Sequence, residues 1–184
     1  MAHVEAPLAR YYGAPPNAFP HGISMLQRLL CLTLVFACAC SGPAEEDPVL
    51  ALREHIEELR AQPELEVPEV EVLQILVAHA DAPRMRGVTR SLEEAEKLAG
   101  ELLLRIRAGE DFDTLRTQYS DDPSSGQYAM TLEPPPPGSM KFHRATMAPS
   151  FGGFSWRLES GEIGVAPYDP QKGPFGYHII KRLR

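Results

Sequence analysis

Apolar residues recur every three or four positions in two parts of the chain, a spacing that places them on one face of a helix. The first part is residues 48–61, where the apolar positions are Val49, Leu52, Ile56 and Leu59. The second begins after Ser91, which with Glu94 has the sequence of a capping box, and it ends at Gly109. We predict two amphipathic helices. We interpret the first as a linker helix that docks on a domain, rather than as a helix that binds a partner.

Two segments rich in Val, Ile and Leu predict strands. One of them, residues 175–183, lies at the end of the chain, and a turn at residues 159–164 leads into an edge strand before it. The other, earlier in the chain, is residues 71–79. Alternation sorts its side chains onto two faces, with Leu73, Ile75 and Val77 on one and Gln74 and Leu76 on the other.

The remaining segments are shorter or irregular. Residues 148–158 predict a short helix weakened by two glycines. Residues 121–146 are predicted to be irregular, because the run Pro134–Pro137 cannot form a helix or a central strand. Residues 110–120 predict another short helix, whose buried side carries Phe112, Leu115 and Tyr119. The order of helices and strands predicts an α+β fold.

Composition narrows the function classes. The net charge of −7 and the lack of a Lys/Arg run argue against nucleic acid as the main partner, because phosphates need a basic face. All three cysteines, Cys31, Cys38 and Cys40, lie in one short segment. The rest of the chain therefore has no disulfide framework, cysteine zinc site or thiol nucleophile. A serine hydrolase is poorly supported, because no G-x-S-x-G sequence occurs.

The cysteine segment has the pattern of a secretory signal. From Met25, a short start with Arg28 is followed by an uncharged apolar run and then by small residues. The sequence VFAC resembles a bacterial lipobox and makes Cys38 the favoured lipidation site, whereas ACAC would make it Cys40. An ordinary signal peptide with incidental cysteines is the alternative. The residue after each candidate, Ala39 or Ser41, is not the aspartate that favours inner-membrane retention, so we expect a periplasmic protein anchored in the outer membrane.

These patterns predict the organisation of the whole chain. Residues 1–24 are a dubious or disordered extension, and residues 25–40 are a lipoprotein signal peptide and lipobox. Residues 41–69 form a polar tether with an amphipathic helix, and residues 70–184 form the domain.

Four motifs in the domain resemble those of parvulin-type peptidyl-prolyl cis/trans isomerases. The run SLEEAEKLAGELLLRIRAGEDFDTLRTQYSDDPSSG is similar to the central helices of that family and the loop after them. VLQILVAH is similar to the first strand, and GEIG with PFGYHIIKR to the closing hairpin. The resemblance implies a four-stranded antiparallel sheet wrapped by about three to four helices. It also implies isomerisation of X-Pro bonds, with no covalent intermediate, no cofactor and no metal.

The resemblance also implies a histidine pair beneath the site, of which only one member is present. His178 matches the histidine of the final strand, and it is expected at the base of a proline pocket, neutral and hydrogen-bonded. The alternative is a core histidine without a catalytic part. Gln74 replaces the partner histidine, and a hydrogen bond between Gln74 and His178 is possible. His79 matches a further histidine of the first strand, or is a polar residue at the strand end.

Other matches concern the reacting amide and the proline pocket. Asp122 falls where the family places a cysteine or aspartate beside the amide, although SDDPSS is also a turn sequence. Met147 and Phe151 match an M-x-x-x-F motif whose side chains line the proline pocket. Tyr128 is expected to replace an aliphatic residue of that pocket. Plain core packing is the alternative for the Met and Phe pair.

The chain also departs from the family. The stretch between Gly126 and Met147 is longer than usual and contains four prolines, and the hairpin at residues 164–176 is extended. Both flank the site, so we expect them either to alter substrate access or to place the proline-rich segment across the site. Arg84 and Arg86 occupy the loop that selects phosphate in some parvulins. We interpret them as solvated surface charges.

The resulting hypothesis is an extracytoplasmic, lipid-anchored prolyl isomerase that acts as a foldase for exported proteins. Its partners would be unfolded or proline-containing polypeptides and, through the lipid, a membrane. The main alternative is a chaperone that binds peptides on the same scaffold without catalysis, which Gln74 favours. A third possibility is a structural lipoprotein that keeps only the fold.

Overall fold

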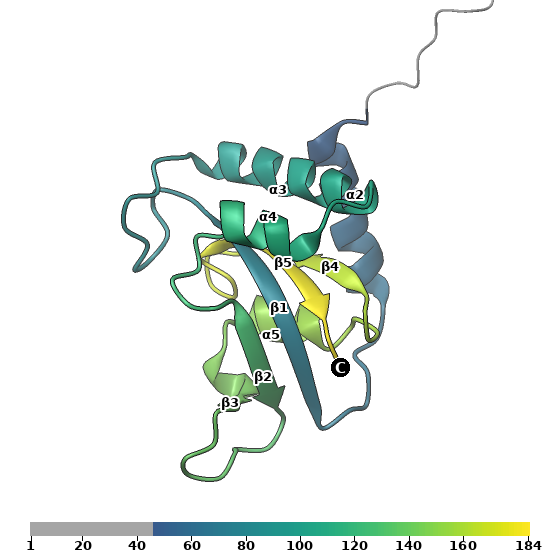
Figure 1. The fold of residues 1–184 in the computed structure, drawn as a ribbon, viewed down its shortest axis with the longest axis vertical. Coiled ribbons are helices and arrows are strands. Elements are labelled where there is room, and N and C mark those ends of the chain that lie inside the picture. Colours follow the sequence, from purple (N-terminus) through teal and green to yellow (C-terminus); the bar gives the residue numbers. More distant parts are fainter. Residues whose placement is uncertain (1–45) are drawn as a thin grey trace, which may run out of the picture. The chain divides into compact units, whose positions relative to one another are not determined.

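Strand β1 (Glu69–Ala78) lies at the centre of a five-stranded sheet with the order β3-β2-β1-β5-β4 (Figure 1). The computed structural model describes residues 46–184. The other strands are β2 (Gln127–Thr131), β3 (Phe142–His143), β4 (Ile163–Ala166) and β5 (Gly176–Arg182). The helices are α2 (Pro48–Ala61), α3 (Leu92–Arg107), α4 (Phe112–Tyr119), α5 (Pro149–Ser155) and a 3-10 turn, Arg144–Thr146. The predicted signal peptide at 25–40, with Cys38 and Cys40, and the predicted extension at 1–24 lie outside the described residues.

The α+β fold is confirmed, with one correction to the sheet. Strands β1, β2, β4 and β5 pair antiparallel, as expected, but β3 adds a fifth strand that runs parallel to β2. Parallel neighbours cannot be joined by a tight turn. The proline-containing loop at residues 132–141 turns the chain back to the end of β2, so that Phe142 pairs with Met130 and His143 with Thr131 in the parallel direction. The sheet is therefore mixed.

The prediction that residues 121–146 are wholly irregular is wrong. Strand β2 lies within them, although its sequence, QYAMT, contains neither Val nor Ile. Its order comes from β1, since Tyr128 pairs with Val72 and Met130 with Val70. This strand is specified by its partner rather than by its own propensity.

The helices begin and end where the local sequence predicts. Both halves of the capping box at Ser91 and Glu94 are formed, and Gly109 follows helix α3 with a φ of 93°, which glycine adopts without strain. Helix α2 begins at Pro48 after Asp47, whose side chain accepts hydrogen bonds from two backbone amides. In the described part of the chain, the helices are too short or too polar to span a membrane.

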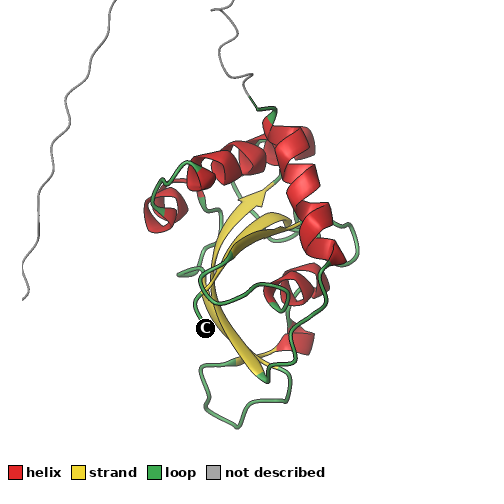
Figure 2. Ribbon diagram, turned by 90° about the vertical axis from the view of Figure 1, so that its right-hand side faces the viewer, coloured by secondary structure: helices red, strands yellow, loops and turns green. Residues whose placement is uncertain are grey.

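Helix α2 belongs to the same compact unit as the sheet. It lies beside α3 at one end of the sheet (Figure 2). Its apolar stripe is buried in the main core, at Leu52, Ile56 and Leu59. At Gly100 of α3 the two helices approach so closely that an added Cβ would lie 2.1 Å from the Pro48 carbonyl oxygen.

Candidate functional site

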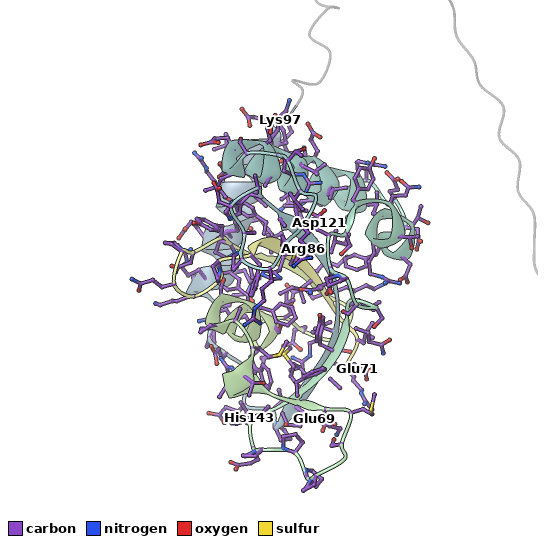
Figure 3. The ribbon with its side chains drawn as sticks, turned by 90° about the vertical axis from the view of Figure 1, so that its left-hand side faces the viewer. Glu69, Glu71, Arg86, Lys97, Asp121 and His143 are labelled. Carbon is purple, nitrogen blue, oxygen red and sulfur yellow. The ribbon has the colours of Figure 1, made fainter. Side chains whose placement is uncertain are left out.

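A cavity of about 350 Å³ opens between the sheet, helix α5 and the loops that follow β1 and α4. Figure 3 shows the side of the molecule on which Asp121 and Arg86 of these loops lie in the middle part, with Glu69 and His143 near the lower end. The cavity lining is mainly apolar, with a few polar groups. Its residues are Gln74, Leu76, Arg84, Met85, Asp122, Pro123, Ser124, Tyr128, Met147, Ala148, Phe151, Phe175 and His178.

The pairing of the strands brings the polar lining residues to one face of the sheet. Gln74 and Leu76 alternate with buried residues that point to the opposite face. His178 pairs with Leu76 across the β1–β5 ladder, and Tyr128 pairs with Val72 across the β1–β2 ladder. Paired residues share a face. Three strands therefore each present a side chain to the same cavity.

Gln74 connects two titratable groups of the site. Its Nε2 donates a hydrogen bond to an oxygen of Asp122, and its Oε1 lies 2.8 Å from Nδ1 of His178. Because an amide oxygen only accepts, His178 carries its proton on Nδ1 and donates it to Gln74. The hydrogen bond between Gln74 and His178 that the sequence suggested is thus present.

His178 is neutral at physiological pH. It is buried, and burial lowers the pKa of its imidazole to about 4, although the charge of Asp122 acts in the opposite direction. Its Nε2 is buried and has no hydrogen-bond partner among residues 46–184. The ring packs against Phe151, with 5.3 Å between the ring centroids. His178 thus supports the cavity floor in a single protonation state.

Asp122 is held as a carboxylate by its neighbours. Burial alone would raise its pKa, but hydrogen bonds from Gln74, Ser124 and Tyr128 outweigh that effect and bring the pKa below its ordinary value. One oxygen accepts from the backbone N and the Oγ of Ser124, at 2.8 and 2.7 Å, and the other accepts from the Tyr128 hydroxyl at 2.8 Å. The site therefore has a fixed negative charge at its polar edge.

The loop that carries Asp122 is aligned along β1. The Leu76 backbone N donates to the Ser120 Oγ at 3.1 Å, and the Ala78 backbone N donates to a carboxylate oxygen of Asp121 at 2.9 Å. Asp121 also forms an ion pair with Arg90. The SDD sequence therefore attaches the loop to the strand and leaves Asp122 turned toward Gln74.

The apolar part of the cavity is built around Phe151 of α5. Pro149 occupies the first turn of that helix, where its fixed φ suits the helix start. The Phe151 ring contacts the Tyr128 ring at 5.6 Å between centroids, in an edge-to-face arrangement. Met147, which precedes the helix, also lines the cavity. The three residues proposed for a proline pocket are thus brought together.

The structure does not bring His79 to the cavity. It lies beyond the end of β1, where its Nε2 is 3.3 Å from the Pro174 carbonyl oxygen and its ring packs edge-on against Tyr168. Strand alternation explains this position, because His79 falls on the same face of the strand as Ile75 and Val77, opposite to the face of Gln74. It helps to hold the extended β4–β5 hairpin.

Several lining residues were not predicted. Arg84 and Met85 come from the loop after β1, where Arg84 has a φ of 64°, an uncommon conformation for a residue with a side chain. Phe175 comes from the extended hairpin and Ser124 from the turn after Asp122. The loop at residues 132–141 does not line the cavity. Among residues 46–184, no cluster of His, Cys, Asp or Glu could hold a metal ion.

The model of the PPIC-type PPIase domain matches residues 56–183. Foldase protein PrsA 4 of Bacillus cereus is 36% identical over 94 residues, which are 51% of this chain and 30% of that protein. Chaperone SurA of Pseudomonas fluorescens is 33% identical over 94 residues, or 51% of this chain and 20% of that protein. The match thus spans less than a third of either relative.

Among solved structures, peptidyl-prolyl isomerase ESS1 from Candida albicans aligns with a TM-score of 0.51 and 20% sequence identity. The alignment covers 73% of this chain and 74% of that one. At this identity the similarity concerns the fold alone.

Proposed function

The chain belongs to the PPIC-type peptidyl-prolyl isomerase family, the parvulins, and from this premise we propose that its domain catalyses cis/trans isomerisation of X-Pro bonds in polypeptide clients. The observation that supports the proposal best is the composition of the cavity. An apolar part formed by Phe151, Met147 and Tyr128 adjoins a polar edge where Asp122 is held as a carboxylate. In this proposal a proline ring occupies the apolar part, and the amide bond that precedes the proline lies beside the Asp122 carboxylate.

The barrier to be lowered is about 18–20 kcal/mol, because conjugation gives the amide C–N bond partial double-bond character. A proline ring held against Phe151 fixes one side of that bond. The negative charge of Asp122 disfavours charge on a carbonyl oxygen placed near it, and so disfavours the conjugated, planar amide. The twisted amide of the transition state keeps less charge on oxygen and is favoured by comparison. No bond to the enzyme forms.

In this proposal Gln74 and His178 are positioning residues. His178 donates to Gln74, and Gln74 donates to Asp122, so these two side chains hold the Asp122 carboxylate in one orientation. Proton transfer by His178 is not required, and a pKa of about 4 leaves it neutral at the pH of folding.

We further propose that the protein is an extracytoplasmic foldase anchored by a lipid. Uncatalysed isomerisation takes tens of seconds, long enough to limit folding. The matched relatives are a foldase and a chaperone by name. The segment at residues 25–40, with Cys38 or Cys40 as the lipidated residue, supports export and anchoring, and the residues after these cysteines favour the outer membrane.

A second function, peptide binding without catalysis, is favoured by Gln74. The family places a histidine there, whereas this chain has a residue that cannot change its charge. A chaperone of this kind would use the same cavity to hold proline-containing segments of unfolded clients, and would leave their isomerisation rate unchanged.

Relaxation of a short X-Pro peptide from cis to trans, followed with and without the purified protein, separates these functions. We expect acceleration by the wild type and a loss of roughly tenfold or more in Phe151→Leu, which shortens the cavity wall. Phe154→Leu is the matched control, because Phe154 is buried in the core and does not line this cavity. The absence of acceleration across several residues before proline would rule out the enzyme. Peptide binding without acceleration would then support the chaperone.

A further inference from the structure

Large apolar side chains are exposed around the loop that joins β2 to β3. Among the described residues, five large apolar side chains are exposed, and three of these lie within residues 132–142. They are Leu132 at 42%, Met140 at 90% and Phe142 at 42% exposure. Isolated exposed apolar residues are ordinary, whereas a group of them marks a surface that binds something. We call these three residues the apolar rim.

Phe142 connects the apolar rim to the wall of the cavity. The Phe142 ring contacts the Tyr128 ring at 5.6 Å between centroids, and Tyr128 in turn contacts Phe151 at the same distance. Aromatic side chains therefore follow one another from the buried cavity wall to the exposed edge of the sheet. Within the part of the chain that the structure describes, strand β3 forms that edge and pairs with β2 alone (Figure 1).

The loop of the rim is held in place even though its apolar side chains are exposed. Lys141 forms an ion pair with Glu69, and the His143 Nε2 donates to the Leu132 carbonyl oxygen at 2.9 Å. The run Pro134–Pro137 has fixed φ angles. Because the loop is already ordered, the binding of a ligand would cost little conformational entropy of the loop.

The distance from the cavity limits what the rim can contact. Two centroid steps of 5.6 Å join Phe151 to Phe142 through Tyr128, and together they set the greatest possible distance between the two outer rings. An extended polypeptide covers such a span with about three residues. A client whose proline ring lies against Phe151 would therefore place a residue about three positions away over Phe142.

We propose that the apolar rim is a second contact surface for the client, and that it selects X-Pro segments with a large apolar residue about three positions from the proline. The inference rests on the proposed isomerase function and names the substrate class of that site. A membrane is disfavoured as the occupant, because the net charge of −7 repels an anionic lipid surface. A second copy of the chain is a competing occupant that the test detects.

The test uses two peptides, each with one X-Pro bond and a single Phe. In one peptide the Phe lies about three residues before the proline, and in the other it lies about three residues after it. Matched peptides carry Ala in place of Phe, or Phe at the far end. The wild-type protein should isomerise one of the first two peptides about tenfold faster, by kcat/KM, than the Ala peptide. In the double variant Phe142→Ser and Met140→Ser this preference should disappear, so that the Phe and Ala peptides are isomerised at equal rates.

Leu50→Ser is the control variant, because Leu50 is 57% exposed on α2 and does not line the cavity. It should keep the preference. If the wild-type protein isomerises the Phe and Ala peptides at equal rates, the inference about the rim is overturned, while the proposed isomerase activity still stands. A change in sedimentation mass of the double variant, with the preference unchanged, would assign the rim to self-association instead.

A second measurement separates failure of the proposed isomerase activity from failure of the proposed client contact at the rim. If no peptide is accelerated, binding of the Phe and Ala peptides is compared by NMR titration. Tighter binding of the Phe peptide that is lost in the double variant supports the rim, and equal binding contradicts it.

Discussion

The amide of Gln74 has one orientation that satisfies both of its neighbours. Its NH₂ group meets the carboxylate of Asp122, so its oxygen meets His178 and fixes the imidazole proton on Nδ1. A histidine in place of Gln74 could also donate to one group and accept from the other. Glutamine therefore keeps the hydrogen-bond chain but removes a group that titrates near neutral pH.

Burial of His178 predicts a loss of stability in mild acid. The pKa of His178 falls from an ordinary value of 6.5 to about 4 in the folded protein. Between these pH values the unfolded chain binds more protons than the folded one, so the free energy of unfolding decreases as the pH is lowered. The decrease should reach at most about 3 kcal/mol. Urea unfolding between pH 7 and 4, compared with His178→Gln, measures it.

A second histidine supplies the control for this experiment. Burial, together with the nearby charge of Arg107, also lowers the pKa of His55 on α2. His55→Gln should remove its own share of the pH dependence and leave that of His178 in place. Asp122 acts at lower pH, because its pKa lies below 3.8. If His178→Gln has the same pH dependence as the wild type, His178 is not held neutral by burial.

At the scale of elements, helix α2 is an integral part of the domain core. Its buried side chains join the main hydrophobic cluster, and its first residue, Pro48, contacts α3 at Gly100. The family match begins at residue 56, within this helix. Helix α2 therefore docks on the domain, as its amphipathic pattern predicted, and its apolar side chains form part of the main core.

Gly100→Ala tests the contact between the two helices. Alanine normally favours a helix over glycine by up to about 1 kcal/mol. Here the added methyl group would lie 2.1 Å from the Pro48 carbonyl oxygen, so backbone must move. We expect a net loss of about 1–3 kcal/mol in the free energy of unfolding, measured by urea denaturation. Lys97→Ala on the exposed side of α3 should change stability by less than about 0.5 kcal/mol, and an equally small change in Gly100→Ala would contradict the tight contact.

At the scale of the whole molecule, this chain matches less than a third of the length of the PrsA and SurA relatives. The anchoring and the clients proposed for this chain are therefore tested on the chain itself.

Lipid attachment is testable in a bacterium that expresses the full chain. Labelling with radioactive palmitate should give a lipid-modified protein, and Cys38→Ser should abolish the label if Cys38 is the modified residue. Cys40→Ser is the matched variant, because it differs in position only, and loss of label there would assign the alternative site. Label in neither wild type nor variants would leave an ordinary signal peptide as the explanation.

The sequence by itself determined the helices, the two long strands and six of the thirteen residues that line the cavity. Helix ends follow from caps and glycines, which act within one turn. Strand alternation sorted Gln74 and Leu76 from Ile75 and Val77, and the parvulin resemblance supplied His178, Asp122, Met147 and Phe151. The same alternation argues against His79, whose parity is that of the opposite face.

Only the tertiary structure decided the pairings that join distant segments. Strand β2 forms because β1 lies beside it, and β3 is parallel because of the path of the loop at residues 132–141. Arg84, Met85 and Phe175 reach the cavity from loops, whose course depends on long-range contacts. The Tyr128 ring links the cavity to Phe142 for the same reason. Local patterns report periodicity and capping, whereas a cavity wall is assembled from residues far apart in the chain.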